Sequence, residues 1–394
     1  MTTTDLNLEI EMLRKLVRDF REKELMPLEK VVIEREARRA LSDIDEPLIP
    51  PDDYARLLKK AKEIGLFGID VPEEYGGMGL GNYAKTVVFQ EIYKTIVPFI
   101  LPPDTPNLHL LIDCCNEEQK ERYLIPYAKG EITSNLALTE PNAGSDAGAI
   151  KMRAERRGDK WVLNGQKTFI SGAAQADFLI TIAVTDPEKG KKGGMTSFLV
   201  DKGTPGVTVT RPIKTINNDQ HPYEVYFENV ELEDSQVLGE IGNAFIPLQN
   251  RLGVRRMELG CRSIAMAERA LEMMIEYSKQ RSTFGALLSE RQAIQWWIAD
   301  SMIDIHAAKL MVDDVAKKMD QGIKDVRKES SMIKVFATEM ATKVLDKAIQ
   351  TYGGNGVTKD FPLEFMYRLI RIFRIVEGPS EVHRYTIARS ALRD

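Results

Sequence analysis

A single carboxylate near the C-terminus is the residue of this chain best suited to acid–base chemistry. Glu377 follows an apolar stretch in the segment Ile375-Val-Glu-Gly-Pro-Ser-Glu381. The neighbours Ile375 and Val376 would shield the carboxylate from water, and a carboxylate removed from water accepts a proton more readily. The pattern indicates a general base. The structural alternative is a carboxylate at a helix N-terminus that interacts with free backbone amides.

A second segment offers small polar side chains and accessible backbone. It reads Leu138-Thr-Glu-Pro-Asn-Ala-Gly-Ser-Asp146 and lies far upstream of Glu377. Thr139 carries a hydroxyl donor, and Gly144 lets the backbone approach a bound planar or charged group. Ser145 is a candidate for contact with a substrate. No GxGxxG motif follows a predicted strand, so any nucleotide must be held outside a doubly wound nucleotide fold.

Together with Gln350-Thr-Tyr-Gly-Gly-Asn-Gly356, these segments resemble the signature regions of the acyl-CoA dehydrogenase family along nearly the whole chain. The resemblance implies an acyl-CoA substrate, FAD as cofactor and an electron-transferring flavoprotein as partner. It also implies that two hydrogens leave adjacent carbons, with Glu377 as base, FAD as hydride acceptor and trans-2-enoyl-CoA as product.

The resemblance further implies which residues bind FAD. Phe169 and Ser171 match positions that cover one flavin face and bond its edge, and an ordinary strand is the alternative. Arg281 matches an arginine that reaches the pyrophosphate of FAD in a neighbouring subunit, which implies a homodimer or homotetramer. A cation at a helix C-terminus is a compatible role for it. The implied cofactor-binding residues are Leu136, Leu138, Thr139, Gly144, Ser145, Phe169, Ser171, Arg281, Thr283, Phe284, Gln292, Gln350, Gly353, Gly354, Ser380 and Glu381.

Substrate contacts are implied for Ser145, Gly378 and Arg256, the last as a cation near the CoA moiety. Some family members carry the base on the helix of Arg256, at the position that is Arg255 here. Arginine cannot accept a proton at working pH, so Arg255 cannot be the base of this chain. Glu258 lies on the same helix and is a weaker rival to Glu377. We expect Glu258 to be a solvent-exposed helix glutamate.

Several positions depart from the family pattern. Pro379 removes an amide donor after the Glu-Gly pair, Leu369 replaces a common aspartate, and Val376 replaces a frequent aromatic residue, which widens the expected acyl pocket. Prolines in the segment 101–107 interrupt a helix that many members continue. Signatures similar to Pro103-Asp-Thr105 and Glu381-Val-His383 occur in a branch that handles unusual, long or branched acyl groups.

The elements that must position these residues change in character along the chain. Residues 1–131 show amphipathic helical spacing, as at 9–21 and 54–64, and residues 132–240 show short β-rich runs. Asn164-Gly165 predicts a hairpin turn. Residues 241–394 return to helical spacing, with one apolar stripe over 294–319. The predicted fold is α+β, with an N-terminal α-helical domain, a middle β-barrel or sandwich domain and a C-terminal four-helix bundle, and the resemblance implies the same.

Composition restricts the class of protein. A formal charge of −5 and 29% charged residues give no basic excess, so nucleic acid is not an expected partner. No run of eighteen apolar residues predicts a membrane span, and the N-terminus lacks a signal-peptide pattern, so we expect a cytoplasmic protein. Three cysteines and four scattered histidines show no metal-ligand spacing, and we expect no metal.

Three further functions remain open. The same site could reduce an enoyl-CoA, or the reduced flavin could pass electrons to oxygen, as in acyl-CoA oxidases. The chain could also be a non-catalytic subunit that completes a partner's site, although its Glu377 argues against that.

Overall fold

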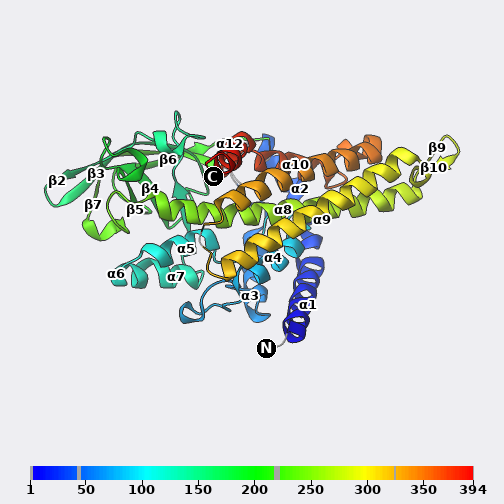
Figure 1. The fold of residues 1–394 in the computed structure, drawn as a ribbon, viewed down its shortest axis with the longest axis horizontal. Coiled ribbons are helices and arrows are strands. Elements are labelled where there is room, and N and C mark those ends of the chain that lie inside the picture. The colour runs from blue at the N-terminus through cyan, green and yellow to red at the C-terminus, as the bar shows by residue number, and fades with distance from the viewer. Residues whose placement is uncertain (1–2, 42–45, 217–221, 324, 394) are drawn as a thin grey trace. The chain divides into compact units, whose positions relative to one another are not determined.

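The computed structural model describes residues 3–41, 46–216, 222–323 and 325–393, and the chain forms two compact units (Figure 1). The helical unit comprises Met1–Leu66, Leu80–Phe99 and Gly253–Asp394. The β unit comprises Phe67–Gly79 and Ile100–Leu252. The expected order of helical, β-rich and helical segments is confirmed.

Long helices dominate the helical unit. Their bounds are α1 Thr3–Phe20, α2 Glu29–Leu41, α3 Pro51–Glu63, α4 Gly81–Ile92, α9 Gln292–Asp320, α10 Arg327–Tyr352, α11 Leu363–Phe373 and α12 Ser380–Ala391. The helix α8 spans Phe245–Gln280, and a short hairpin of β9 Ser282–Thr283 and β10 Ala286–Leu287 follows it.

Close packing holds α8, α9 and α10 together. A Cβ added to Gly260 of α8 would stand 2.4 Å from Ile333 Cγ2 of α10 and 3.1 Å from Val312 Cγ2 of α9. The glycine therefore lets α8 approach both neighbours. Buried residues of α10 recur at helical spacing from Ile333 to Leu345, and α10 packs on α9, α11 and α12.

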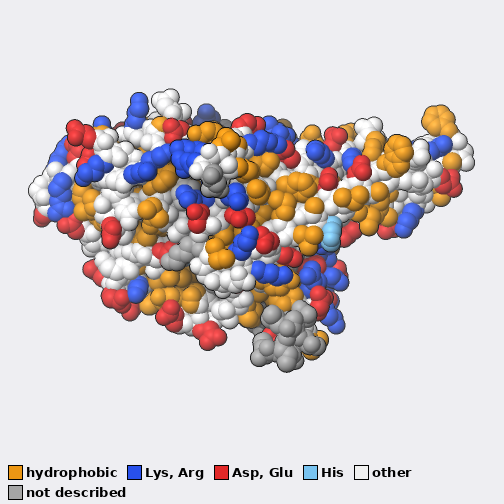
Figure 2. All heavy atoms as spheres, viewed as in Figure 1, with side chains coloured by type: hydrophobic (Ala, Val, Ile, Leu, Met, Phe, Trp, Pro, Cys, Tyr) orange, Lys and Arg blue, Asp and Glu red, His pale blue; other side chains and the backbone are white. Residues whose placement is uncertain are grey.

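The single apolar stripe expected over 294–319 is only partly right. Buried positions of α9 such as Ile305 and Val312 follow the expected period, whereas Met302 and Leu310 are 56% and 57% exposed. The reason is that α9 carries apolar residues on two faces, and the single chain covers one of them. Figure 2 shows hydrophobic side chains on the part of the surface that α9 and α10 form, and at the β9–β10 hairpin.

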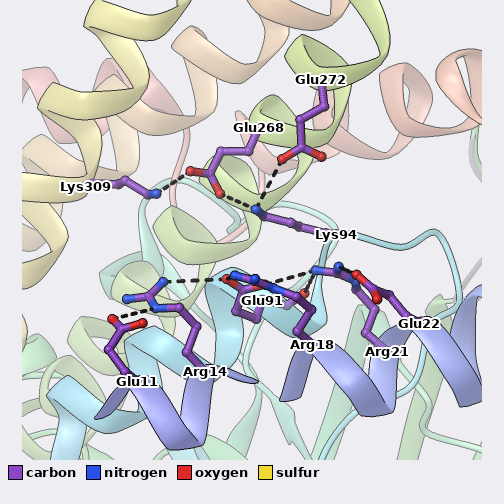
Figure 3. A network of polar contacts seen from close by, with 10 residues as sticks. All are labelled: Glu11, Arg14, Arg18, Arg21, Glu22, Glu91, Lys94, Glu268, Glu272 and Lys309. Atoms are coloured by element: carbon purple, nitrogen blue, oxygen red, sulfur yellow. Dashed lines mark hydrogen bonds and ion pairs between the residues drawn. The ribbon is translucent and has the colours of Figure 1, made fainter. Parts of the chain in front are cut away.

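A polar network joins α1, α4, α8 and α9, the last through Lys309, which pairs with Glu268 (Figure 3). Glu91 of α4 is almost fully buried and forms ion pairs with Arg14, Arg18 and Arg21. Burial alone would raise the pKa of the Glu91 carboxyl, but Lys94 and the arginines hold it below its usual value. Beside it, Lys94 pairs with Glu268, 3.0 Å away. The network fixes α4 between its neighbouring helices.

The N-terminus of α4 is capped from a distant helix. Asp320, the last residue of α9, accepts hydrogen bonds from the backbone N–H groups of Asn82 and Tyr83 at 2.6 and 2.9 Å. Gly81 is left-handed (φ +78°), and a Cβ there would stand 2.8 Å from Asp320 Oδ1. The carboxylate satisfies amides that the helix itself leaves without partners.

An eight-stranded mixed sheet forms the centre of the β unit, with the strand order β6-β7-β3-β2-β4-β5-β8 and β1 paired in parallel with β4. The strands are β1 Ser134–Ala137, β2 Arg153–Arg157, β3 Lys160–Ser171, β4 Phe178–Val184, β5 Met195–Asp201, β6 Val207–Pro212, β7 Pro222–Leu232 and β8 Val237–Leu238. The short helices α5 Thr105–Cys114, α6 Glu117–Gln119 and α7 Ile125–Ala128 precede them.

Alternate residues of β4 fill two cores. Phe178 and Ile180 pack with Leu111 of α5 and Tyr127 of α7, whereas Leu179 belongs to a core on the opposite face of the strand. Because β4 is covered on both faces, all of its residues are buried. This explains the uninterrupted apolar run in its sequence.

The hairpin predicted at Asn164-Gly165 is wrong. Both residues lie inside β3, and the turn that joins β2 to β3 is at 158–159. Gly165 serves close packing instead, because a Cβ there would stand 2.7 Å from Met152 Cγ. Asn164 accepts a hydrogen bond at 2.9 Å from the backbone N–H of Asn229 on β7, where the register shifts. The dipeptide therefore marks a bulge in a continuous strand.

Candidate active site

Glu377 lies on the short connection between α11 and α12. Its backbone is left-handed (φ +56°), which is uncommon for a residue with a side chain, and Gly378 follows with φ +96°. The residue is partly exposed. Ile375 and Val376 were expected to shield its carboxylate from water, but they are 56% and 39% exposed and do not bury it in the single chain. The N-cap of α12 is Pro379, which makes no side-chain capping bond.

Side chains from two helices hold the backbone carbonyl of Glu377. Arg256 Nε of α8 donates to this oxygen at 3.2 Å, and His383 Nε2 of α12 lies 3.1 Å from it. A third side chain, Lys334 of α10, donates to the carbonyl of Gly378. The expected substrate residues Arg256 and Gly378 thus lie beside Glu377.

Neither Lys334 nor His383 is a site residue predicted from the sequence. Both are buried, at 0% and 1% exposure. Burial, followed by the charge of Arg256, lowers the pKa of the Lys334 ammonium to about 8 and the pKa of the His383 imidazole to about 4. The available signal was a lysine inside the apolar, helix-spaced run 330–341, where charge is rarely placed without a partner.

Glu258 is not the exposed helix residue that its sequence position suggested. It is 1% exposed and forms ion pairs with Lys85 of α4, itself 1% exposed, and with Arg255, whose Nη1 lies 2.8 Å from Glu258 Oε2. The cause is the close packing of α4 on this stretch of α8. With both carboxylate oxygens in ion pairs, Glu258 is poorly placed to act as a base.

A second group of expected cofactor residues lies at the other end of α10. Arg281 directly follows α8, Thr283 and Phe284 belong to the β9–β10 hairpin, and Gln292 begins α9. Gln350 lies in the last turn of α10, and Gly353 and Gly354 follow it. Tyr352 stacks on Tyr277, one turn before Arg281, with ring centroids 4.1 Å apart, so these segments are neighbours.

This second group is remote from Glu377 within one chain. Lys334, which contacts the connection that carries Glu377, and Gln350 are sixteen positions apart on α10, a separation of roughly 24 Å at 1.5 Å per residue. Ser380 and Glu381, in contrast, start α12 directly after the Glu377 connection, Ser380 buried and Glu381 exposed. The expected residues therefore form two separate sets in the helical unit.

The β unit brings together a third set. Leu136 lies on β1, and Leu138 and Thr139 follow that strand. The backbone N–H of Thr168 donates to the carbonyl of Thr139 at 2.8 Å, which ties this segment to the end of β3. Phe169 and Ser171 lie there, and Phe169 is left-handed (φ +56°) and exposed where the register with β7 shifts.

A buried ion pair shapes the loop that carries Gly144 and Ser145. Lys167 Nζ lies 2.8 Å from Glu140 Oε1 and donates to the carbonyl of Leu138 at 2.9 Å. Glu140 also accepts from the backbone N–H groups of Lys151 and Met152. Burial lowers the pKa of Lys167 to about 8 despite the opposing effect of Glu140. Gly144 and Ser145 themselves are exposed.

The side chains and backbone present in the β unit fit a flavin. Thr139, Ser145 and Ser171 offer hydroxyl groups at or near the surface, and Phe169 displays an aromatic ring. A Cβ at Gly144 would meet only Thr139 Cγ2, at 3.9 Å, so the backbone there is open to a ligand.

The helical unit offers groups that fit the dinucleotide part of FAD. The guanidinium of Arg281 is exposed and suits a pyrophosphate. A Cβ added to Gly353 or Gly354 would meet no atom within 4 Å. The two glycines thus leave room for a ligand against the backbone.

Two kinds of feature are absent from the described part of the chain. Among those residues, no group of three or more His, Cys, Asp or Glu side chains is arranged to hold a metal ion. No helix there combines the length and apolar character that are needed to cross a bilayer.

Comparison with known proteins identifies the family. Models of the acyl-CoA dehydrogenase N-terminal, middle and C-terminal domains match residues 7–131, 135–230 and 245–392. The (R)-benzylsuccinyl-CoA dehydrogenase of Thauera aromatica is 45% identical over 98% of this chain and 96% of its own length. A subunit of the caffeyl-CoA reductase-Etf complex of Acetobacterium woodii is 34% identical over 97% of this chain and 98% of its own length.

A solved structure agrees with this match. Butyryl-CoA dehydrogenase from Megasphaera elsdenii superposes with a TM-score of 0.87 at 30% identity, covering 98% of both chains. The chain therefore belongs to the acyl-CoA dehydrogenase family and is an FAD-dependent oxidoreductase that acts on CH–CH bonds.

Proposed function

We propose that this chain dehydrogenates an acyl-CoA thioester to the trans-2-enoyl-CoA, with Glu377 as the base. The observation that carries the proposal is the backbone conformation of Glu377 and the contacts that hold it. Its backbone is left-handed, its carbonyl is held by Arg256 and His383, and its side chain stays partly exposed. Strained backbone that the surroundings hold in place is typical of catalytic residues.

Each residue of this connection has a chemical role in the proposal. Glu377 removes the proton from the carbon next to the thioester carbonyl. The backbone amide of Glu377 donates a hydrogen bond to the thioester oxygen and stabilises the enolate-like charge that develops. Gly378 adds no side chain beside the substrate. FAD, when bound, supplies the acceptor for the hydride that leaves the neighbouring carbon.

The remaining expected residues are proposed to bind the cofactor. The set in the β unit, from Leu136 to Ser171, contacts the flavin ring. Arg281, Gln350 and their neighbours contact FAD of a neighbouring subunit, which the separation of roughly 24 Å along α10 supports. Within this proposal, Ser145 and Arg256 contact the substrate.

We propose an acyl group that carries a bulky aryl or branched substituent. The names of two relatives, a benzylsuccinyl-CoA dehydrogenase and a caffeyl-CoA reductase subunit, each specify an aromatic acyl group. Val376, a small side chain where the family often has an aromatic one, supports a wider pocket.

Reduction of an enoyl-CoA at the same site is the second candidate. The relative from Acetobacterium woodii is named as a reductase and as part of a complex with Etf. This name also supports an electron-transferring flavoprotein as the partner that exchanges electrons with this chain.

We further propose a cytoplasmic homodimer or homotetramer. Phe284 at the hairpin tip is fully exposed, and Trp296 and Ile303 of α9 are exposed by 61% and 66%. A second copy would cover such apolar surface.

Anaerobic titration of the purified yellow protein tests the proposal. Benzyl-substituted, branched and straight-chain acyl-CoA thioesters are added in turn, and the flavin absorbance is followed. Bleaching by one class of thioester, with the matching enoyl-CoA as product, supports dehydrogenation. If no acyl-CoA bleaches the flavin but an enoyl-CoA oxidises the dithionite-reduced enzyme, the result would favour the reductase. Rapid reoxidation in air would favour an oxidase.

A further inference from the structure

Two consecutive residues at the proposed base adopt positive φ angles. Glu377 has φ +56° and Gly378 has φ +96°. A non-glycine residue in the left-handed region is strained, so other contacts must hold Glu377 there. The neighbouring carbonyl oxygens of Glu377 and Gly378 are the atoms that such contacts can use.

Three side chains from three helices provide these contacts. Arg256 of α8 and His383 of α12 bind the oxygen of Glu377, and Lys334 of α10 binds the oxygen of Gly378. All three are buried, with Lys334 at 0% and His383 at 1% exposure. Arginine and lysine donors are charged, and such bonds are stronger than those between neutral groups.

The hydrogen bonds of His383 determine its tautomer. A carbonyl oxygen can only accept, so the Nε2 that lies 3.1 Å from the Glu377 oxygen must carry the hydrogen. His383 Nδ1 then accepts from the hydroxyl of Ser331, 3.0 Å away and buried on α10. A Cβ at Gly378 would stand 2.9 Å from Nε2, so a side chain there would displace the imidazole.

Lys334 is the less expected member, because an ammonium is costly to bury in a helical bundle. The charged or titratable groups that act on it come from every side. They are Arg256 on α8, Glu377 on the connection, Glu381 and His383 on α12, and Glu339 on α10 itself. Its hydrogen bond, however, goes to a backbone carbonyl of the connection that carries Glu377.

We infer that Lys334 and His383 are positioning residues, which hold residues 377–378 in the left-handed conformation and so fix the direction of the Glu377 carboxylate. The inference rests on the proposed function of Glu377. Ser331 contributes indirectly, because its hydroxyl orients the imidazole of His383.

Variants of the flavin-loaded enzyme test this inference. In Lys334→Met and His383→Leu, kcat for flavin reduction should fall roughly 10- to 100-fold, the usual effect of losing a hydrogen bond in a buried site, while KM changes much less. His383→Gln keeps an N–H donor and should recover kcat to within about threefold of wild type. Lys343→Met, on the exposed face of the same helix, is the matched control.

Two readouts separate positioning from general stability. Wild-type kcat should decline above about pH 8 as Lys334 loses its proton, and Lys334→Met should lack this decline. In hydrogen exchange, the peptide covering residues 374–380 should exchange roughly tenfold faster in Lys334→Met and His383→Leu than in Lys343→Met.

The outcomes distinguish this inference from the proposed function. If Glu377→Gln keeps turnover, the assignment of the base fails, whereas hydrogen exchange still reports on the backbone. If Glu377→Gln is inactive but Lys334→Met and His383→Leu match Lys343→Met in kcat and exchange, the positioning role is overturned. Should Lys334→Met fail to fold, the comparison of His383→Leu with His383→Gln decides, and equal loss of kcat in both would overturn the role.

Discussion

Lys85 of α4 and Glu258 of α8 form an ion pair that is almost completely removed from water, each residue being 1% exposed. Arg255 binds the second carboxylate oxygen of Glu258. Removing one partner of a buried pair leaves an uncompensated charge. Glu258→Ala should therefore lower the free energy of unfolding by about 3–5 kcal/mol.

Thermal or denaturant unfolding checks this, with the double variant Lys85→Met/Glu258→Leu as control. The double variant should be more stable than Glu258→Ala, because it leaves no buried charge from the pair. A Glu258→Ala protein of wild-type stability that has lost turnover would instead assign a catalytic role to Glu258.

The buried pair of Lys167 and Glu140 predicts an effect on cofactor retention. Lys167→Met removes the donor to Leu138 and Glu140, so the loop that presents Thr139 and Ser145 should lose its order. FAD affinity should fall roughly 10-fold or more, the effect of losing a charged hydrogen bond. The ratio of flavin to protein absorbance after gel filtration measures it.

Lys160→Met is the control, because Lys160 lies on the same strand and pairs with Glu231 at the surface. Surface pairs of this kind contribute little. Equal flavin loss in both variants would contradict a role for the buried pair.

The sequence predicts the base itself, but it does not predict the side chains that hold the base in position. Glu377 and its neighbours were found because the segment itself resembles a family signature. Lys334 and His383 were missed because their role depends on α10 and α12 meeting one backbone connection, which no local pattern encodes.

The fold shows the same limit. The change from helical to β and back was predictable from the spacing of apolar residues. The Asn164-Gly165 hairpin was wrong because turn propensity does not register that Gly165 must pack on Met152. The burial of Glu258 was missed because a helical pattern does not reveal that Lys85 packs against it.

Acid should destabilise the protein partly through His383. The unfolded chain takes up a proton near pH 6.5, whereas burial delays protonation of the folded imidazole to about pH 4. Between these values the unfolded state binds more protons, so the free energy of unfolding falls as pH falls. The shift corresponds to about 3 kcal/mol.

His383→Gln should lose this part of the pH dependence, which unfolding experiments at pH 7 and pH 4.5 would measure. The exposed His306 gives the control His306→Gln, which should behave as wild type. Identical pH dependence in all three proteins would show that His383 does not resist protonation.

Asp320 should stabilise α4 from the end of α9. Asp320→Ala removes the acceptor for two backbone N–H groups of the first turn, and the loss of such a cap costs about 1–2 kcal/mol. Asp314→Ala, on the same helix, removes only an exposed pair with Lys318 and should change stability by less than about 0.5 kcal/mol. The melting temperatures of the two variants measure this difference, and equal melting temperatures would argue against the cap.

The most direct test of the central claim is stopped-flow reduction of the bound flavin in wild type and Glu377→Gln, with the acyl-CoA that bleaches the wild type. Glu377→Gln should retain FAD and bind the thioester, but its rate of flavin reduction should fall roughly 10²- to 10⁴-fold, the usual contribution of a general base. A Glu377→Gln enzyme that reduces its flavin at the wild-type rate would contradict the assignment of Glu377 as the base.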